Sequence, residues 1–406
     1  MRILMLSWEY PPKSVGGLAQ HVYDLTKAMA QQQAEIHLIT IGSPGVPDYQ
    51  LVDGVHVYRV IPYQVSSPDF ITWVMQLNVA ILEKCLSLIK DLTKPFDIIH
   101  AHDWLVAYAA RALKHALNVP LIATIHATEY GRNNGLHNEL QRHISDIEWW
   151  LCYEAWRVIV CSNYMRGELR HVFQVPEDKL IVIPNGVDVE NFTVKETNVN
   201  RENYAAANEK IVFYVGRLVR EKGVQVLIDA IPKILHYHPN TKFIIAGKGP
   251  NEIALKRQAK KMGVEQHIYF TGYVNDNTRN NLYQLSDVAV FPSLYEPFGI
   301  VALEGMAAQT PVVVSDTGGL GEIINHGING LKAYVGNENS LADNILHILL
   351  NPESAKRMKE QAYQQVMAKY NWGSIAKQTL ALYQGLLNHT GMMEKVLAGQ
   401  QLIQEG

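Results

Sequence analysis

The chain has 406 residues, of which 48% are hydrophobic and 18% are charged, so it is long enough to build two globular domains with substantial cores. Its formal net charge of −3 offers no basic excess, which disfavours nucleic acid or an anionic membrane as the main partner. The three cysteines neither pair evenly nor show zinc-site spacing, so we expect reduced, buried thiols and a cytoplasmic protein.

The lengths of the apolar runs indicate whether the chain has a signal peptide or a membrane-spanning helix. The first run, "RILML", is too short for a signal-peptide core, and no later stretch reaches the ~20 apolar residues of a membrane-spanning helix. We therefore expect a soluble protein. Residues 73–92 are amphipathic and are predicted to pack on a sheet. The alternative, a helix lying on a membrane surface, leaves peripheral association with the inner face of the membrane open.

Short apolar runs alternate with helical periodicity through both halves of the chain. The first half contains "RILML", "EIHLITI", "FDIIHAH", "PLIATIHA", "RVIVCS" and "LIVIPNG", and the second half contains "KIVFYVGRL", "TKFIIAGKG", "HIYFTGYV", "VAVFPS" and "TPVVVSD". Apolar strands that alternate with helices are typical of parallel sheets covered on both faces. The sequence therefore predicts an α/β protein with two Rossmann-like, doubly wound domains.

A break in this alternation marks the expected domain boundary. The turn-rich residues 184–188, "PNGVD", lead into a polar segment over residues 193–210. We expect an N-terminal domain over residues 1–187 and a C-terminal domain over residues 188–372, with the helical tail, residues 373–406, packing back on the first domain. Two such domains are expected to face each other across a deep cleft, where the carboxyl ends of their strands meet a shared ligand.

Two adjacent glycines, Gly16 and Gly17, stand between the first predicted strand and a helix. Glycine lets the backbone approach a ligand closely, and the free N–H groups of a helix start favour an anion such as phosphate. Neither "KSVGGLAQ" nor the corresponding "GRLVREKG" of the second half matches the dinucleotide fingerprint, and the P-loop pattern is absent. These absences disfavour a nicotinamide oxidoreductase, a kinase and an ATPase.

Arg217 and Lys222 follow the first strand of the second half, with Arg220 between them. The two cations could neutralise a diphosphate, the arginine through its planar fork and the lysine as a point charge. Taken alone, this segment is equally well explained as a solvated helix start.

Glu296 and Glu304 stand eight residues apart in "EPFGIVALE". Eight helical residues rise roughly 12 Å, so these carboxylates are too far apart to act as an acid/base pair on one bond. They could instead bind two separate hydroxyl-bearing groups of one elongated ligand. The alternative is a favourable charge at a helix start and a solvated helix residue.

Histidines end two strands of the first half. "IIHAHDW" places His100, His102 and Asp103 at a strand end, but further metal ligands do not follow locally and no Asp-x-Asp pair occurs, so we expect no metal. His126 in "TIHATEYGR" is placed to hydrogen bond with a ligand, and a core histidine is the alternative.

These segments together resemble the retaining glycosyltransferases of the large family 4, which share the two-domain GT-B fold. The resemblance rests on "KSVGGL", "HAHDW", "TIHATEYGR", "IPNGVD", "GRLVREKG", "AGKGP" and "EPFGIVALE", and it runs from Met1 to about Trp372. "SWEYPP…GGL", "HAHDW" and "HATEYGR…EWW" are most similar to the glycogen-synthase-like branch, which includes bacterial polysaccharide glucosyltransferases. The resemblance implies transfer of glucose from UDP-glucose or ADP-glucose to a glycan hydroxyl. The nucleotide sugar is then a substrate, and no cofactor or metal is expected.

The resemblance also implies roles on the phosphate side of the donor. The backbone N–H groups of Gly16 and Gly17 would bind the distal phosphate, while Arg217 and Lys222 would balance the departing diphosphate. Further donor contacts are implied for the backbone at Phe298, Gly299 and Ile300, and for Lys248 and Val274 near the nucleoside.

On the sugar side, the resemblance implies that Glu296 holds donor-sugar hydroxyls and that Glu304 binds the ribose. His126 would lie near the 6-hydroxyl of the transferred sugar, and Asp103 would face the acceptor. His126, Arg217, Lys222 and Glu296 are therefore the expected catalytic residues. Net retention is implied, with the acceptor hydroxyl attacking from the face of the leaving group and domain closure excluding water.

Three alternatives share this fold. They are a sugar-nucleotide 2-epimerase, a mannosyltransferase that uses GDP-mannose, and a non-catalytic protein that binds nucleotide sugars. The acceptor stays open among a glycogen-like primer, an envelope or exopolysaccharide chain and a lipid-linked oligosaccharide. The nucleotide base, the linkage, the pathway and the oligomeric state are equally open.

Overall fold

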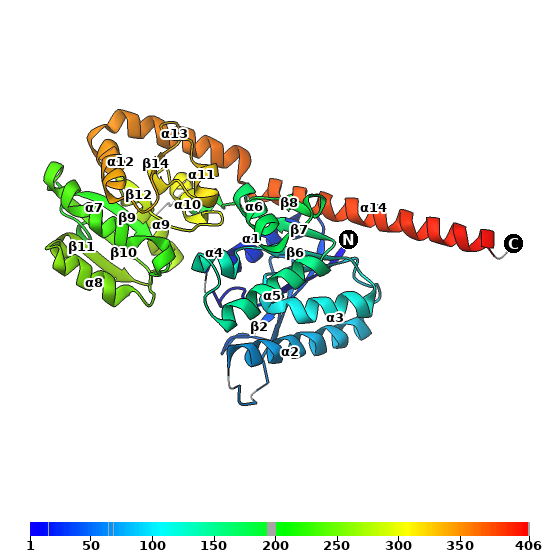
Figure 1. The fold of residues 1–406 in the computed structure, drawn as a ribbon. Helices are drawn as coiled ribbons and strands as arrows, with labels where there is room; N and C mark the ends of the chain where they lie inside the picture. Colours follow the sequence, from blue (N-terminus) through cyan, green and yellow to red (C-terminus); the bar gives the residue numbers. More distant parts are fainter. Residues whose placement is uncertain (15, 64, 68, 193–199, 405–406) are drawn as a thin grey trace. The chain divides into compact units, whose positions relative to one another are not determined.

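The computed structural model describes the chain except for residues 15, 64, 68, 193–199 and 405–406 (Figure 1). The chain forms two compact units. The first comprises Met1–Cys161, Arg166–Ile183 and Trp372–Gly406, and the second comprises Ser162–Met165 and Pro184–Asn371. Residues 193–199, which begin the polar segment expected after the domain boundary, lie outside the described residues.

The N-terminal unit is built on an eight-stranded sheet of order β3-β4-β2-β1-β5-β6-β7-β8. All neighbouring strands are parallel except β3 and β4. Every residue of the central strands β5 and β6 is buried, which explains why they are mostly apolar; His100, His102 and Thr124 are buried polar exceptions within them. The strands are β1 (Arg2–Ser7), β2 (Glu35–Ile41), β3 (Tyr49–Val52), β4 (Val55–Val60), β5 (Ile98–His102), β6 (Leu121–Ile125), β7 (Arg157–Val160) and β8 (Leu180–Val182).

Helices cover this sheet. They are α1 (Gly17–Gln31), α2 (Phe70–Asp91), α3 (Ala107–Leu117), α4 (Glu129–Asn133), α5 (Glu139–Glu154) and α6 (Asn163–Phe173), which starts in the second unit. Helix α2 packs against β2, β4 and α3. By length and composition alone, α2 is the one helix in the described part of the chain that could cross a membrane.

The C-terminal helix α14 (Trp372–Gln404) belongs to the N-terminal unit and packs against α1. Trp372, Ile375 and Tyr383 of α14 are buried in the same hydrophobic cluster as Ile3 and Met5 of β1. The last helix of the chain therefore completes the core of the first domain.

The C-terminal unit is built on a six-stranded parallel sheet of order β11-β10-β9-β12-β13-β14. Its strands are β9 (Lys210–Val215), β10 (Thr241–Ala246), β11 (Ile268–Gly272), β12 (Val288–Phe291), β13 (Val312–Ser315) and β14 (Leu331–Ala333). Its helices are α7 (Val224–Tyr237), α8 (Glu252–Lys261), α9 (Asp276–Leu285), α10 (Ile300–Ala307), α11 (Gly318–Ile323), α12 (Glu338–Leu350) and α13 (Pro352–Lys369). The prediction of two Rossmann-like α/β domains is confirmed.

Each sheet has one point at which the strand order reverses direction. In the N-terminal sheet the chain adds strands outward from β1 on one side and from β5 on the other. In the C-terminal sheet the reversal lies between β9 and β12. Ligands of open α/β sheets bind beyond the carboxyl ends of the strands at such a switch point. The loops after β1, β5, β9 and β12 are therefore the places where a site is expected.

Candidate functional site

The glycine pair Gly16–Gly17 follows β1 at the N-terminal switch point. Helix α1 starts at Gly17, and no side-chain cap is formed at its start among the described residues. Gly16 has an extended backbone, with φ of −157°, and no described atom lies within 4 Å of where its Cβ would be. Neither strain nor crowding within the chain requires glycine at position 16. A bare backbone there leaves room for a ligand beside the N–H groups of the first turn.

Asp103 follows β5 at the same switch point and connects two loops. Its Oδ1 accepts a hydrogen bond of 2.8 Å from the backbone N–H of His126, which follows β6. The backbone of Asp103 has a φ of 58°, an uncommon conformation for a residue with a side chain. Burial raises the pKa of Asp103 to about 6, although the charge of Arg132 and the hydrogen bond from His126 act in the opposite direction.

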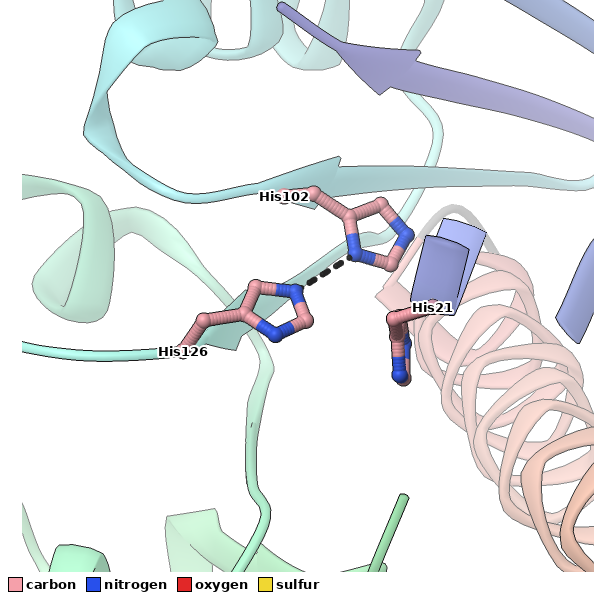
Figure 2. A group of neighbouring side chains, drawn as sticks. All are labelled: His21, His102 and His126. Atoms are coloured by element: carbon pink, nitrogen blue, oxygen red, sulfur yellow. Dashed lines mark hydrogen bonds between the residues drawn. The ribbon is translucent and has the colours of Figure 1, made fainter. Parts of the chain in front are cut away.

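His126 is part of a cluster of imidazoles (Figure 2). Its Nε2 lies 3.1 Å from Nδ1 of His102, and the ring of His21 lies 4.6 Å from its own ring, edge to face. Burial lowers the pKa of His126 to about 3 and the pKa of His102 well below its ordinary value. At neutral pH these two rings are therefore uncharged hydrogen-bonding groups rather than cations.

A second layer supports the histidine cluster from behind. His100 Nε2 lies 2.7 Å from Thr124 Oγ1, and its Nδ1 lies 2.5 Å from the hydroxyl of Tyr383 on α14. The ring of Trp372, also on α14, packs edge-on against His21 at 5.4 Å. The sequence analysis missed this contribution, because only the fold brings residues nearly 300 positions apart into contact.

Lys222 lies at the C-terminal switch point, at the end of a short 3-10 turn (Arg220–Lys222) between β9 and α7. Its Nζ forms an ion pair of 2.7 Å with Oε2 of Glu296, which follows β12. Gly223 makes this approach possible: its φ is +70°, and a Cβ there would lie 1.8 Å from the carbonyl oxygen of Pro292. The structure thus brings together two predicted catalytic residues that are 74 positions apart.

Arg217 lies two residues after the end of β9 and is exposed. The two predicted cations thus lie in one loop, and of the two it is Lys222 that forms the ion pair with Glu296. An exposed guanidinium keeps its N–H donors accessible to an anionic ligand.

Glu296 is buried and is held by backbone and side-chain contacts. Ser293 donates a hydrogen bond of 3.2 Å to its Oε2, and Gly319 donates one of 2.9 Å from its backbone N–H to the carbonyl oxygen of Glu296. A Cβ at Gly318, where φ is +51°, would lie 2.0 Å from that carbonyl oxygen. The sequence analysis missed this support, although "SDTGGLG" is a further junction of strand, paired glycines and helix.

Phe298, Gly299 and Ile300 form the start of helix α10. Gly299 is the N-cap with a φ of 106°, and no side chain caps the helix among the described residues. Phe298 and Gly299 are buried, whereas Ile300 is partly exposed. The first turn of α10 therefore has backbone donors that no described side chain satisfies.

Glu304 is buried on the same helix, where two residues of α9 contact it. Tyr283 donates a hydrogen bond of 3.0 Å to Oε2, and Nη1 of Arg279 lies 3.5 Å from Oε1. Burial raises the pKa of Glu304, opposed by the charge of Arg279 and the hydrogen bond from Tyr283. The sequence analysis missed both partners; their spacing of four residues, on one face of a predicted helix, was the available signal.

Lys248 and Val274 lie beyond the ends of β10 and β11, at the same edge of the C-terminal sheet. Lys248 is exposed and Val274 is partly exposed. A Cβ at Gly272 would lie 3.7 Å from Cε of Lys248, so the lysine side chain runs along the end of β11.

Two family models match the chain and together cover most of it. The model described as "Glycosyltransferase Family 4" matches residues 15–191, and the model described as "Glycosyl transferases group 1" matches residues 196–365. They meet near the boundary between the two compact units.

Relatives match along nearly the full length. The chain is 40% identical over 388 residues to an uncharacterized glycosyltransferase of Methanocaldococcus jannaschii, with 94% of this chain and 98% of that protein covered. It is 35% identical over 396 residues to the glycogen synthase of Mycobacterium tuberculosis, with 94% of each chain covered.

Solved structures with similar folds are also found. Sucrose-phosphate synthase from Thermosynechococcus elongatus superposes with a TM-score of 0.83 at 24% identity, covering 96% of this chain and 99% of that chain. Anabaena HepE, solved with UDP and glucose, superposes with a TM-score of 0.77 at 20% identity, covering 95% and 100%.

Proposed function

Because the chain belongs to glycosyltransferase family 4, with the GT-B fold and glycogen-synthase-like relatives, we propose that it transfers glucose from UDP-glucose or ADP-glucose to a glycan hydroxyl. Transfer proceeds with retention of the anomeric configuration and without a metal ion. The observation that carries the proposal is the contact between Lys222 and Glu296 at the C-terminal switch point. It joins a cation suited to phosphate and a carboxylate suited to sugar hydroxyls.

The phosphate side of the proposal rests on accessible cations and backbone donors. The Lys222 side chain keeps 27% of its surface exposed despite its ion pair, so a diphosphate can reach it. Arg217 is exposed in the same loop, and the start of α10 offers backbone N–H groups. Charge-assisted hydrogen bonds of this kind are about twice as strong as neutral ones. Together they supply the charge balance that a metal supplies in other transferases.

The sugar side of the proposal rests on groups that are held rigidly. Glu296 is fixed by Ser293 and Gly319, so its carboxylate can accept hydrogen bonds from donor-sugar hydroxyls without reorganising. Glu304, held by Tyr283 and Arg279, is placed to bind the ribose hydroxyls. Uncharged His126 is a hydrogen-bonding partner for the sugar, and Asp103 faces the acceptor.

The chemical step needs stabilisation of charge. The bond between the anomeric carbon and the β-phosphate oxygen breaks, and a new bond forms to the acceptor oxygen. The acceptor proton passes to the departing phosphate oxygen on the same face, which gives retention. Preorganised donors and cations lower the barrier where negative charge develops, and removing one such donor typically costs about 10²–10³-fold in rate.

The choice of glucose rests on similarity. The glycogen synthase of Mycobacterium tuberculosis is 35% identical over nearly the full chain, and the HepE structure contains UDP and glucose. The sucrose-phosphate synthase structure has the same fold. A glucosyl donor and a glycan acceptor are therefore the proposed substrates of this chain.

The test is a donor panel in the presence of EDTA. The protein is incubated with UDP-glucose, ADP-glucose or GDP-mannose, each with and without maltoheptaose, and ¹H NMR follows the anomeric protons of any sugar released or transferred. We expect one glucose donor to react and to give an α-configured product. Lys256→Ala, an exchange on the surface of α8, is the matched control and should react like the wild type.

Three outcomes would overturn parts of the proposal. A β-configured product would exclude retention, and activity that EDTA abolishes would exclude metal independence. Release of UDP together with an epimerised sugar, in the absence of any acceptor, would indicate a sugar-nucleotide 2-epimerase instead.

A further inference from the structure

The proposed reaction assigns no role to His102, although its side chain is hydrogen bonded to His126, which is expected to contact the transferred sugar. Its Nδ1 lies 3.1 Å from Nε2 of His126, and no hydrogen-bond partner in the described part of the chain reaches its own Nε2, which is buried. Figure 2 shows the two rings joined by this single contact, with the second nitrogen of His126 directed away from His102.

A hydrogen bond between two neutral imidazoles has a direction. Each neutral ring carries one N–H and one lone pair, so either His102 donates to His126 or the reverse. In the reverse arrangement, His126 donates from Nε2, and the proton of His102 must sit on its other nitrogen. That nitrogen is buried without an acceptor, and buried N–H groups without partners are rare and costly in proteins.

The other direction leaves only a lone pair unsatisfied at His102 Nε2. His102 then carries its proton on Nδ1 and donates it to Nε2 of His126. Since Nε2 of His126 is the acceptor, its proton must lie on Nδ1. His126 is only partly buried, and its backbone is fixed by the hydrogen bond to Asp103, so this N–H has a defined direction.

We propose that His102 is a positioning residue that fixes His126 in the Nδ1–H tautomer, so that His126 donates a hydrogen bond to a hydroxyl oxygen of the bound sugar. This inference rests on the proposed function in one respect, the identity of the ligand. The tautomer itself follows from the contacts within the chain. With its proton fixed on Nδ1, His126 can only donate there, so it favours a ligand that places an oxygen with a free lone pair next to that nitrogen.

The first experiment reads the tautomer directly. Two-bond ¹H–¹⁵N correlation NMR on the wild-type protein, with ¹⁵N-labelled histidine, distinguishes protonated from unprotonated ring nitrogens, and loss of signals in His126→Asn and His102→Asn assigns the two rings. We expect both rings to be protonated at Nδ1 at pH 7.5. Protonation of His126 at Nε2 would overturn the proposal, whatever reaction the protein catalyses.

The second experiment exchanges the donor for an acceptor at nearly constant shape. In His102→Asn the amide N–H group stands near the former Nδ1 and can still donate, whereas the ionised carboxylate of His102→Asp, which the assay at pH 8.5 favours, offers only oxygens that accept. We expect His102→Asn to retain kcat with the glucose donor within about threefold, and His102→Asp to lose about tenfold or more, the size of one lost hydrogen bond. Binding of UDP, measured by titration calorimetry, should persist in both variants and shows that they are folded.

The outcomes separate the two proposals. If the donor panel gives transfer but both variants lose activity equally, His102 has no directional role and the proposed function still stands. If NMR finds the expected tautomer but no nucleotide sugar reacts, the proposed function fails and the positioning role survives.

One further outcome would overturn the proposal. Ring nitrogens of His21, His102 and His126 lie within 4.8 Å of one another, so stoichiometric Zn²⁺ binding that displaces the Nδ1 proton of His102 would contradict its positioning role.

Discussion

The switch points of the two domains occupy the same place in the same fold but are built from opposite chemistry. Beyond β1, β5 and β6, the N-terminal domain gathers uncharged imidazoles, with Asp103 as a carboxyl group whose pKa burial raises to about 6. Beyond β9 and β12, the C-terminal domain gathers ion pairs: Lys222 with Glu296, and Glu304 with Arg279 of the neighbouring helix α9. The fold supplies the location, and the side chains decide whether it binds by neutral hydrogen bonds or by charge.

This difference matches the two halves of a group transfer. In the proposed reaction, a departing diphosphate develops negative charge and needs cations, which Arg217 and Lys222 of the C-terminal domain would provide. The neutral sugar and acceptor need directed hydrogen bonds, which His126 and Asp103 of the N-terminal domain would add to those of Glu296. Each domain can therefore be disabled separately, and the resulting losses should differ in size and kind.

The largest effect is expected from removing the central cation of the C-terminal domain. Lys222→Ala should lower kcat by about 10³-fold, because a preorganised charge at the leaving group acts mainly in the transition state. Circular dichroism should show an intact fold, and Lys256→Ala should behave like the wild type in the same kinetic assay. Wild-type kcat in Lys222→Ala would remove its assigned role.

A smaller loss is expected at its carboxylate partner. Glu296→Gln keeps the shape but removes the charge that pairs with Lys222, and it should lower kcat by about 10²-fold. Because the two residues share one contact, the double variant should lose less than the product of the single losses. Full additivity in this double-mutant cycle would show that the ion pair has no functional coupling.

A third loss should affect binding rather than turnover. Glu304→Gln and Arg279→Met each disturb the proposed ribose site, and each should raise KM for the nucleotide sugar about tenfold with little change in kcat. Steady-state kinetics of both variants checks this split. A fall in kcat at unchanged KM would place Glu304 at the reacting bond instead.

The last expected effect concerns folding stability rather than catalysis, and it is a pH effect on the N-terminal domain. Burial lowers the pKa of His126 from 6.5 to about 3, so the stability that this uncharged ring contributes is present above pH 6.5 and is lost as the pH falls toward 3. Between pH 6.5 and 4, wild-type protein should therefore lose more stability than His126→Asn, by at most ~1.4 kcal/mol per pH unit. Urea unfolding of both proteins measures the difference, and parallel pH profiles would contradict the burial of an uncharged ring.

The sequence was sufficient for the parts of this comparison that depend on local pattern. The alternation of apolar runs with helical periodicity predicted both sheets. Glycines and charged residues that follow strands singled out Gly16, Lys222 and Glu296 as candidate site residues. It could not predict which of these side chains meet, because contacts such as that of Lys222 with Glu296 depend on how the loops of different strands are placed.

Support from distant segments was equally hidden from the sequence. Tyr383 reaches His100 from the last helix of the chain, and Gly318, the first residue of α11, accommodates the backbone of Glu296. Neither residue lies in a motif that carries chemistry on its own. The role of His102 depends on a hydrogen bond and a buried nitrogen, which no spacing in the chain reveals.

The most direct test of the account is titration calorimetry of EDTA-treated protein with UDP-glucose and ADP-glucose, comparing the wild type with Lys222→Ala. The account predicts that the wild type binds one of these donors without any divalent ion and that Lys222→Ala binds it more weakly. Binding that appears only after a divalent cation is added, or that is unchanged in Lys222→Ala, would contradict the claim that the cations of the C-terminal domain hold the diphosphate.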